Sequence, residues 1–173
     1  MTNKLLLNSL RFVFLILLQA LVVKNINFGM YLILLPYILI ILSLPFETPK
    51  LLVLGLSFFT GFTMDIFYST PGLHASACSF MGFARHYIMA LVAPRDGYDE
   101  SQHPSIEVMG FEWFAKYAGI LIFIHHLAFF FLETFRLNET FHILFRTLLS
   151  TLGTFVLVAL LQYLFNTNRF RRK

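Results

Sequence analysis

Charged and histidine side chains that interrupt apolar stretches are the residues of this chain best suited to chemistry. Asp65, His74, His126, Glu133 and Arg146 each lie within or at the edge of a run of Leu, Ile and Phe. A charged side chain costs roughly 2.5–3.5 kcal/mol at the centre of an inserted helix, so it should face another helix, a cavity or a partner. Such a set can fix helix packing, line a solvated cavity or partner-facing groove, or carry protons.

Motifs for catalysis or metal binding are missing from the sequence. It has no glycine-rich phosphate loop, no His-Glu-x-x-His and no Gly-x-Ser-x-Gly. His125 and His126 are adjacent, so their rings on a helix point about 100° apart and would not easily share one ion. Cys78 is the single cysteine, which excludes an intrachain disulfide and a zinc-binding cysteine cluster. We expect no enzymatic activity, no cofactor and no metal.

The apolar stretches themselves predict an all-α integral membrane protein. Hydrophobic residues make up 58% of the 173 residues and charged residues 13%, unlike a soluble domain. A helix needs about 20 apolar residues to cross the ~30 Å hydrocarbon core. We predict a bundle of six spans in one transmembrane domain, 1–173, with the spans at 5–23, 30–46, 50–69, 73–93, 111–134 and 140–166.

Each of the first two spans contains a residue that is unusual in a membrane helix. Arg11 interrupts the first, and no clear cleavage site follows Ala20, so we interpret it as a retained helix and not a signal peptide. The second is short, with Pro36 inside it and Pro45 at its end. Pro36 lacks a backbone donor and predicts a kinked helix, with a re-entrant segment as the alternative.

Lys and Arg residues outside the spans predict the orientation. With both termini cytoplasmic, the outer loops carry only Lys24 and Arg136. The inner side then carries Lys4, Lys50, Arg95 and a basic tail of Arg169, Arg171, Arg172 and Lys173. The polar loop 94–110 is also cytoplasmic in this arrangement, either as a flexible connector or as a docking segment. The dispersed basic residues do not indicate nucleic-acid binding.

Helical spacing places small and polar residues on one face of five spans. Residues 3, 4, 7, 8 or 11 apart share a helix face. Small residues let helices approach closely and polar ones hydrogen-bond between helices, so these stripes should face the bundle centre. They are Asn8, Arg11, Leu15 and Gln19; Ser57, Gly61 and Asp65; His74, Cys78, Gly82 and Arg85; Gly119, His126 and Glu133; and His142, Arg146, Ser150 and Gly153.

The predicted orientation places most of these charges in the outer half of the bundle, with Arg11 and Arg85 nearer the inner half. There we expect Asp65 to be ionised and paired, with Arg146 as its best partner and His126 or His74 as secondary ones. The stripes that contain Gly61 and Gly82 flank the turn at 70–72. We expect them to form a groove that receives a partner helix.

Three stretches resemble the rod shape-determining protein MreD family. That family has a short span that ends in Gly-x-x-x-Asp, followed by a glycine-containing turn into the next helix. The segments Ile124-His125-His126 and Phe131-Leu132-Glu133 also fit a branch of the family. The stretches are Leu44-Pro45-Phe46-Glu47-Thr48-Pro49, Gly61-Phe62-Thr63-Met64-Asp65-Ile66-Phe67 and Gly72-Leu73-His74-Ala75-Ser76-Ala77.

The resemblance implies a non-enzymatic component of the cell-elongation machinery in the bacterial cytoplasmic (inner) membrane. MreD proteins bind the bitopic protein MreC, in a complex with the MreB filament and the peptidoglycan polymerase pair. Their six-helix fold resembles the S-component of energy-coupling-factor vitamin transporters. Asp65 and its companion Gly61 are the motif residues that carry over.

Two other functions remain open at the level of sequence. A substrate-binding subunit of a small-molecule transporter would need a closed ligand pocket among the inward stripes. A lipid-processing membrane enzyme would need a catalytic set, and none is recognisable.

Overall fold

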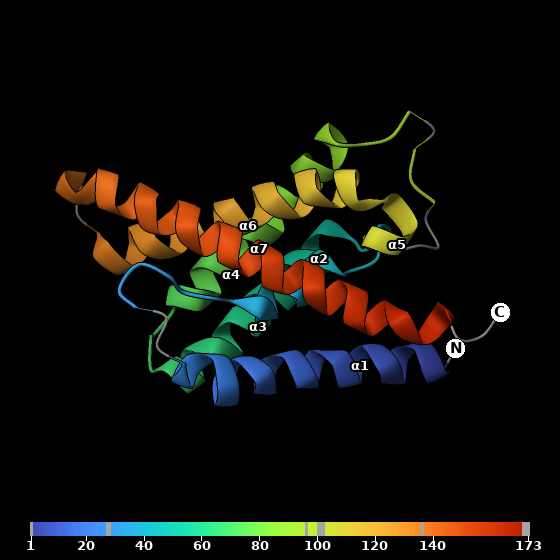
Figure 1. Cartoon of the computed structure of the whole chain (residues 1–173), viewed down its shortest axis with the longest axis horizontal. Helices are drawn as coiled ribbons and strands as arrows, with labels where there is room; N and C mark the ends of the chain where they lie inside the picture. Colours follow the sequence, from blue (N-terminus) through green and yellow to red (C-terminus); the bar gives the residue numbers. More distant parts are fainter. Residues whose placement is uncertain (1, 27–28, 96, 100–102, 136, 171–173) are drawn as a thin grey trace.

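In the computed structural model the chain folds as a bundle of helices (Figure 1). The structure describes residues 2–26, 29–95, 97–99, 103–135 and 137–170, without the side chains of 2–9, 137 and 166–170. No strand occurs within these ranges. The described elements are α1 (Thr2–Leu17), η1 (Leu18–Val22), η2 (Val23–Asn25), η3 (Pro36–Ile38), α2 (Leu39–Leu42), α3 (Lys50–Tyr68), α4 (Leu73–Leu91), α5 (Ile106–Met109), α6 (Phe111–Thr134), η4 (Leu137–Glu139) and α7 (Thr140–Phe170).

Within the described residues, three helices are long and apolar enough to cross a membrane. They are α3, α6 and the part of α7 from Thr140 to Phe165. Their length and composition indicate a membrane protein. The helices expected over 50–69, 73–93, 111–134 and 140–166 are present as α3, α4, α6 and α7. The helix expected over 5–23 is α1, extended to Asn25 by the π-helical turn η1 and the 3-10 turn η2.

The single helix predicted over 30–46 is wrong. Residues 29–35 have no helical structure, and only the short elements η3 and α2 follow. Pro36 is the reason, because it begins η3 and has no N–H, and it disfavours the helical region at Leu35, which takes φ −128° and ψ 65°.

This broken segment forms the centre of the core. The side chains of Leu35, Tyr37, Ile38, Leu39, Ile41 and Leu42 are all at most 2% exposed. The bundle therefore wraps around residues 35–42, which explains why a stretch with so little helix is so apolar.

Consecutive long helices pack side by side around this core. α3 packs on α4, α4 on α6, and α6 on α7, while α1 contacts η3 and α2. Figure 1 shows both termini and α5 at one end of the bundle. The α3–α4 and α6–α7 connections lie at the opposite end. The connections thus alternate between two ends, as a chain that crosses a membrane repeatedly requires.

Candidate functional site

Asp65 caps the helix that follows its own. α3 ends in a turn with Ser69 in the left-handed region, at φ 57°. The Asp65 carboxylate then accepts hydrogen bonds from the backbone N–H groups of His74 (2.9 Å) and Ala75 (3.0 Å) and from the Thr70 hydroxyl (2.9 Å). The first N–H groups of a helix have no partner within it, and the helix dipole favours a negative charge there. Asp65 therefore fixes the α3–α4 corner.

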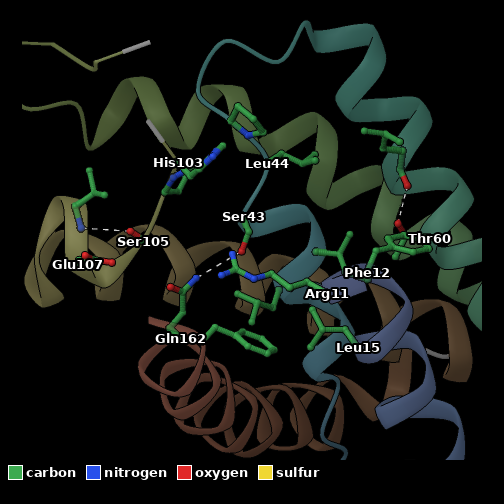
Figure 2. Close-up of a pocket in the computed structure, with 17 residues that line it drawn as sticks. Arg11, Phe12, Leu15, Ser43, Leu44, Thr60, His103, Ser105, Glu107 and Gln162 are labelled. Atoms are coloured by element: carbon green, nitrogen blue, oxygen red, sulfur yellow. Dashed lines mark hydrogen bonds between the residues drawn. The ribbon is translucent and has the colours of Figure 1, made fainter. Parts of the chain in front are cut away.

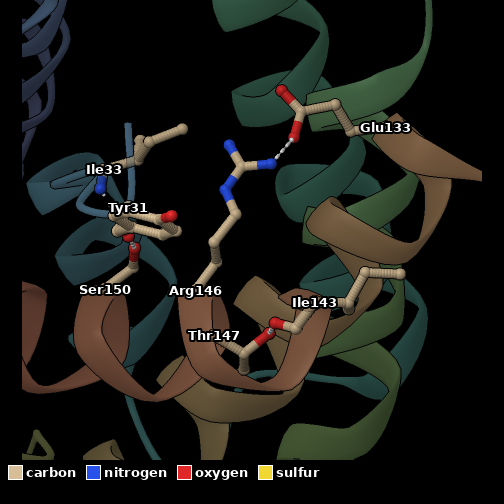
Figure 3. A network of polar contacts seen from close by, with 7 residues as sticks. All are labelled: Tyr31, Ile33, Glu133, Ile143, Arg146, Thr147 and Ser150. Carbon is tan, nitrogen blue, oxygen red and sulfur yellow. Dashed lines mark hydrogen bonds and ion pairs between the residues drawn. The ribbon is translucent and has the colours of Figure 1, made fainter. Parts of the chain in front are cut away.

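The predicted ion pair between Asp65 and Arg146 is wrong. Arg146 donates instead to the Glu133 carboxylate at 2.8 Å (Figure 3). Its guanidinium carbon lies 4.3 Å from the ring centroid of Phe130. Glu133 lies in the last turn of α6 and Arg146 in the second turn of α7, so this pair joins two consecutive helices. The prediction failed because Asp65 finds its partners in backbone N–H groups, which side-chain spacing does not reveal.

The groove expected beside Gly61 and Gly82 is also wrong, because the two stripes pack on each other. A Cβ atom at Gly61 would lie 2.5 Å from the Cα of Ala75 and 2.6 Å from its nitrogen. A Cβ atom at Gly82 would lie 2.8 Å from the Cβ of Ser57. Both glycines therefore allow direct contact between α3 and α4 and leave no room for a third helix.

Tyr37 lies at the centre of a buried polar cluster. Its hydroxyl is 2.9 Å from Nδ1 of His74 and 3.1 Å from Nε2 of His125. Cys78 Sγ lies 3.6 Å from both the Tyr37 hydroxyl and His125 Nε2. A phenol has one proton, so Tyr37 donates to one imidazole and accepts from the other. These contacts tie the core segment to α4 and α6.

The side chains of this cluster are not arranged as metal ligands. Among the described residues, no group of three His, Cys, Asp or Glu side chains is placed to hold a metal ion. The Phe129 ring, 4.9 Å from the His74 ring, closes the cluster on its apolar side. The arrangement is a hydrogen-bonded core that specifies how three segments meet.

His126 faces away from that cluster, toward α7. Its Nδ1 lies 2.9 Å from the Ile122 carbonyl, a pure acceptor, so Nδ1 carries the proton. Nε2 then accepts from the Thr154 hydroxyl at 3.3 Å. That hydroxyl oxygen in turn accepts the backbone N–H of Leu35 at 3.2 Å. The divergence expected for His125 and His126 is confirmed, and His126 helps to hold the non-helical segment.

The non-helical segment has its backbone bonded by neighbouring side chains. Ser150 accepts the N–H of Ile33 at 3.0 Å, as the network in Figure 3 illustrates, and Gln19 donates to the carbonyl of Leu34 at 3.3 Å. A Cβ atom at Gly153 would lie 2.7 Å from a methyl carbon of Leu34. Irregular backbone is tolerated at membrane depth only when protein groups satisfy it. Here Ser150 and Thr154 of α7, together with Gln19, supply these hydrogen bonds.

Arg85 binds the non-helical backbone that follows α2. Its Nη2 donates to the carbonyls of Leu44 (2.6 Å) and Pro45 (3.3 Å), and its Nε donates to the Tyr117 hydroxyl at 2.9 Å. Tyr117 itself donates to the Leu42 carbonyl at 3.1 Å. The guanidinium is buried, and it binds backbone carbonyls of the non-helical residues that follow α2.

Part of the loop 94–110 packs on the bundle. The Tyr98 ring stacks on Phe46 with centroids 4.4 Å apart, and its hydroxyl donates to the Met89 carbonyl at 2.6 Å. Burial raises the pKa of Tyr98, so the phenol keeps the proton that it donates. Ser105 caps α5 by accepting the N–H of Val108 at 3.3 Å.

The structure thus divides the predicted polar cluster into separate contacts. Of the residues expected to face the bundle centre, most are buried, but Arg11 and Glu133 are exposed. Tyr37 and Thr154 were not among the residues expected to face the bundle centre. Thr154 follows Ser150 by four residues, and Tyr37 is the single hydroxyl-bearing residue in 32–42, so both left a signal. The side chains of Lys4, Asn8, Arg136, Arg169, Arg171, Arg172 and Lys173 lie outside the described part of the chain.

Comparisons of the chain with protein-family models, with curated proteins and with solved structures gave no match. The resemblance to MreD proteins therefore rests on the motif residues themselves, whose places in the fold are now known.

Proposed function

We propose that this chain is a membrane scaffold of the MreD type in the bacterial cytoplasmic membrane. In this role it binds an MreC-like bitopic protein and connects it, directly or through other subunits, with the MreB filament and the peptidoglycan polymerases. One observation carries the proposal. The two motif residues of the resemblance act together, because Gly61 allows α3 to contact Ala75 and Asp65 caps α4 at His74 and Ala75.

The proposal includes six passages through the membrane, with both termini cytoplasmic and a fold similar to an S-component. The broken segment can supply the second passage. The seven non-helical residues 29–35 span at most about 23 Å, at roughly 3.3 Å each. Seven helical residues, 36–42, add about 12 Å at 1.5–2 Å each. Their sum reaches the ~30 Å of the hydrocarbon core.

The transporter alternative has less support from the packing of the stripes. It requires a ligand pocket enclosed by them, near the end where Asp65 lies. There the space is occupied by Tyr37, His74 and His125, each at most 1% exposed. Helix corners that are packed this tightly suit a binding platform better than a ligand chamber.

The partner helix needs a different surface from the one the sequence suggested. The outward face of α3 is a candidate, because Phe58, Phe59 and Phe62 on it are 46%, 65% and 49% exposed. Gly55 lies one turn before them, and a Cβ atom there would meet nothing within 4 Å. A small residue beside large ones allows a second helix to approach closely in lipid. We place the MreC-like transmembrane helix on this face.

Co-purification of an MreC-like single-span protein with the tagged chain tests the proposal. Gly55→Leu should abolish capture, whereas Gly119→Leu, at an equally open position on α6, should not. Depletion of the chain should turn rod-shaped cells round. Normal capture by Gly55→Leu would remove the α3 face from the proposal. Absence of capture by the unmodified chain, with rod shape kept on depletion, would overturn the scaffold function.

A further inference from the structure

A cavity of about 230 Å³ lies beside α1, α2, α3, α5 and α7 (Figure 2). The helix α1 borders this cavity. The turn η1, which follows α1, is joined to the end of α3 because Gln19 donates to the Tyr68 hydroxyl at 2.6 Å. Apolar side chains line much of the cavity. They are Phe12, Leu15, Leu39, Ile40 and Leu56. Its polar lining comes from Arg11, Ser43, Thr60, His103, Ser105, Glu107 and Gln162.

Arg11 differs from the other arginines that the structure describes within the bundle. Arg85 binds carbonyls and Arg146 binds a carboxylate. For Arg11 the contact shown is the Phe165 ring, whose centroid is 5.4 Å from the guanidinium carbon. Figure 2 shows its guanidinium directed toward Ser43 and Gln162. Within the described part of the chain, no carboxylate forms an ion pair with it.

Glu107 supplies a charge of the opposite sign on the same cavity. It is exposed on α5, and among the described contacts it forms no ion pair with Arg11. A cation and a carboxylate that line one cavity without pairing leave both charges available to a ligand. A guanidinium binds phosphate through two parallel hydrogen bonds, and a carboxylate accepts hydrogen bonds from an ammonium group.

We propose that this cavity binds a phospholipid with a zwitterionic phosphoethanolamine head group. One acyl chain lies along the apolar lining, the phosphate binds Arg11, and the ammonium group binds Glu107. The apolar lining favours a lipid over free phosphate, and the Glu107 carboxylate favours an ammonium head group over an uncharged glycerol. The inference is independent of the scaffold function, since it uses only the cavity and a membrane environment.

Native mass spectrometry of the full chain in mild detergent tests this site. The probes are phosphatidylethanolamine, phosphatidylglycerol and phosphatidylcholine with identical acyl chains, and inorganic phosphate as a competitor. We expect retention of phosphatidylethanolamine above the other two lipids and no displacement by phosphate. Arg11→Gln should weaken retention of every phospholipid at least about tenfold, the value of one of the two charge-assisted hydrogen bonds that the guanidinium would make. Glu107→Gln should remove only the preference for phosphatidylethanolamine.

Two further variants separate binding from folding. Lys116→Gln and Glu112→Gln remove an exposed cation and an exposed carboxylate that pair with each other at 2.7 Å on α6, outside the cavity, and should leave retention unchanged. Leu56→Trp keeps both charges but fills the cavity from α3, and should reduce retention as strongly as Arg11→Gln. Equal retention by Arg11→Gln and the unmodified chain would overturn the proposal. Equal losses in Lys116→Gln would do the same.

Discussion

Charged residues inside this bundle act chiefly at the ends of helices. Asp65 binds the N-terminus of α4, and Arg85 binds backbone carbonyls of the residues that follow α2. The Asp65 carboxylate is opposite in sign to the helix end that it meets, so the helix dipole and the unpaired N–H groups stabilise it. The Arg85 guanidinium is stabilised by the carbonyl oxygens that accept its hydrogen bonds. Asp65 and Arg85 thus bind backbone groups, whereas Glu133 and Arg146 bind each other.

Removal of the Asp65 carboxylate should destabilise the α3–α4 corner. Asp65→Ala leaves the N–H groups of His74 and Ala75 without an acceptor, and we expect a loss of about 2 kcal/mol in the free energy of unfolding. Asp65→Asn keeps one acceptor oxygen and should lose less. Glu47→Ala, which removes an exposed carboxylate, serves as the control. Unfolding can be followed by thiol labelling of the buried Cys78. Equal stability of Asp65→Ala and Glu47→Ala would contradict the cap.

At the scale of elements, the sequence predicted the long helices and failed at the segment between α1 and α3. Apolar length alone identifies α3, α6 and α7, and the small-residue spacing of α3 and α4 correctly placed Gly61 and Gly82 at a close contact. The error was the neighbour assigned to that contact. For residues 29–42, Pro36 indicated that a helix would be interrupted. The hydrogen bonds that replace the lost helical ones come from the side chains of Gln19, Ser150 and Thr154. Those contacts are remote in sequence, so local patterns do not reveal them.

The hydroxyls of α7 that bind the non-helical segment should matter more than hydroxyls that bond within α7. Thr154→Val removes the acceptor of the Leu35 N–H and should cost about 1–3 kcal/mol, since a buried donor is left unpaired. Thr147 is equally buried, but its hydroxyl donates only to the Ile143 carbonyl of its own helix. Thr147→Val should therefore cost less. Denaturant titration of both variants in detergent measures the difference, and a larger loss for Thr147→Val would contradict this role of α7.

Three glycines of α3 and α4 should respond differently to alanine. Gly61→Ala places a methyl group against the backbone of Ala75, which cannot rotate away, and should cost about 1–3 kcal/mol or more. Gly82→Ala meets the side chain of Ser57, so Ser57→Gly should compensate it in part. Gly55→Ala meets open space and should be neutral or stabilising, because alanine favours helix by about 1 kcal/mol.

A double-mutant cycle checks this contact map. The unfolding free energies should show favourable coupling between Gly82→Ala and Ser57→Gly, and little coupling between Gly61→Ala and Ser57→Gly. If both pairs coupled equally, the loss would reflect a general sensitivity of these helices and not the specific contacts between α3 and α4.

At the scale of the whole molecule, the alternation of chain ends fits the distribution of basic residues. The termini and the end of the bundle that carries α5 lie together (Figure 1), and the sequence places most Lys and Arg residues outside the spans on that side. Basic residues near short loops favour the cytoplasmic face during insertion. The broken second segment preserves this alternation only if it passes through the bundle from one end to the other, as its proposed length allows.

Cysteine labelling in intact cells tests this arrangement and the broken passage together. In a Cys78→Ser background, Asn138→Cys lies at the α6–α7 connection and Arg95→Cys lies in the 94–110 loop, and both native side chains are exposed. A membrane-impermeant maleimide should label position 138 from outside the cell, and position 95 only after the membrane is permeabilised. Asn25→Cys adds the decisive third position, because it precedes the broken segment and should be labelled from outside, like 138. Lys50→Cys follows that segment and should be protected, like 95. Labelling of positions 25 and 50 from the same side would show that residues 29–42 return to the face from which they entered.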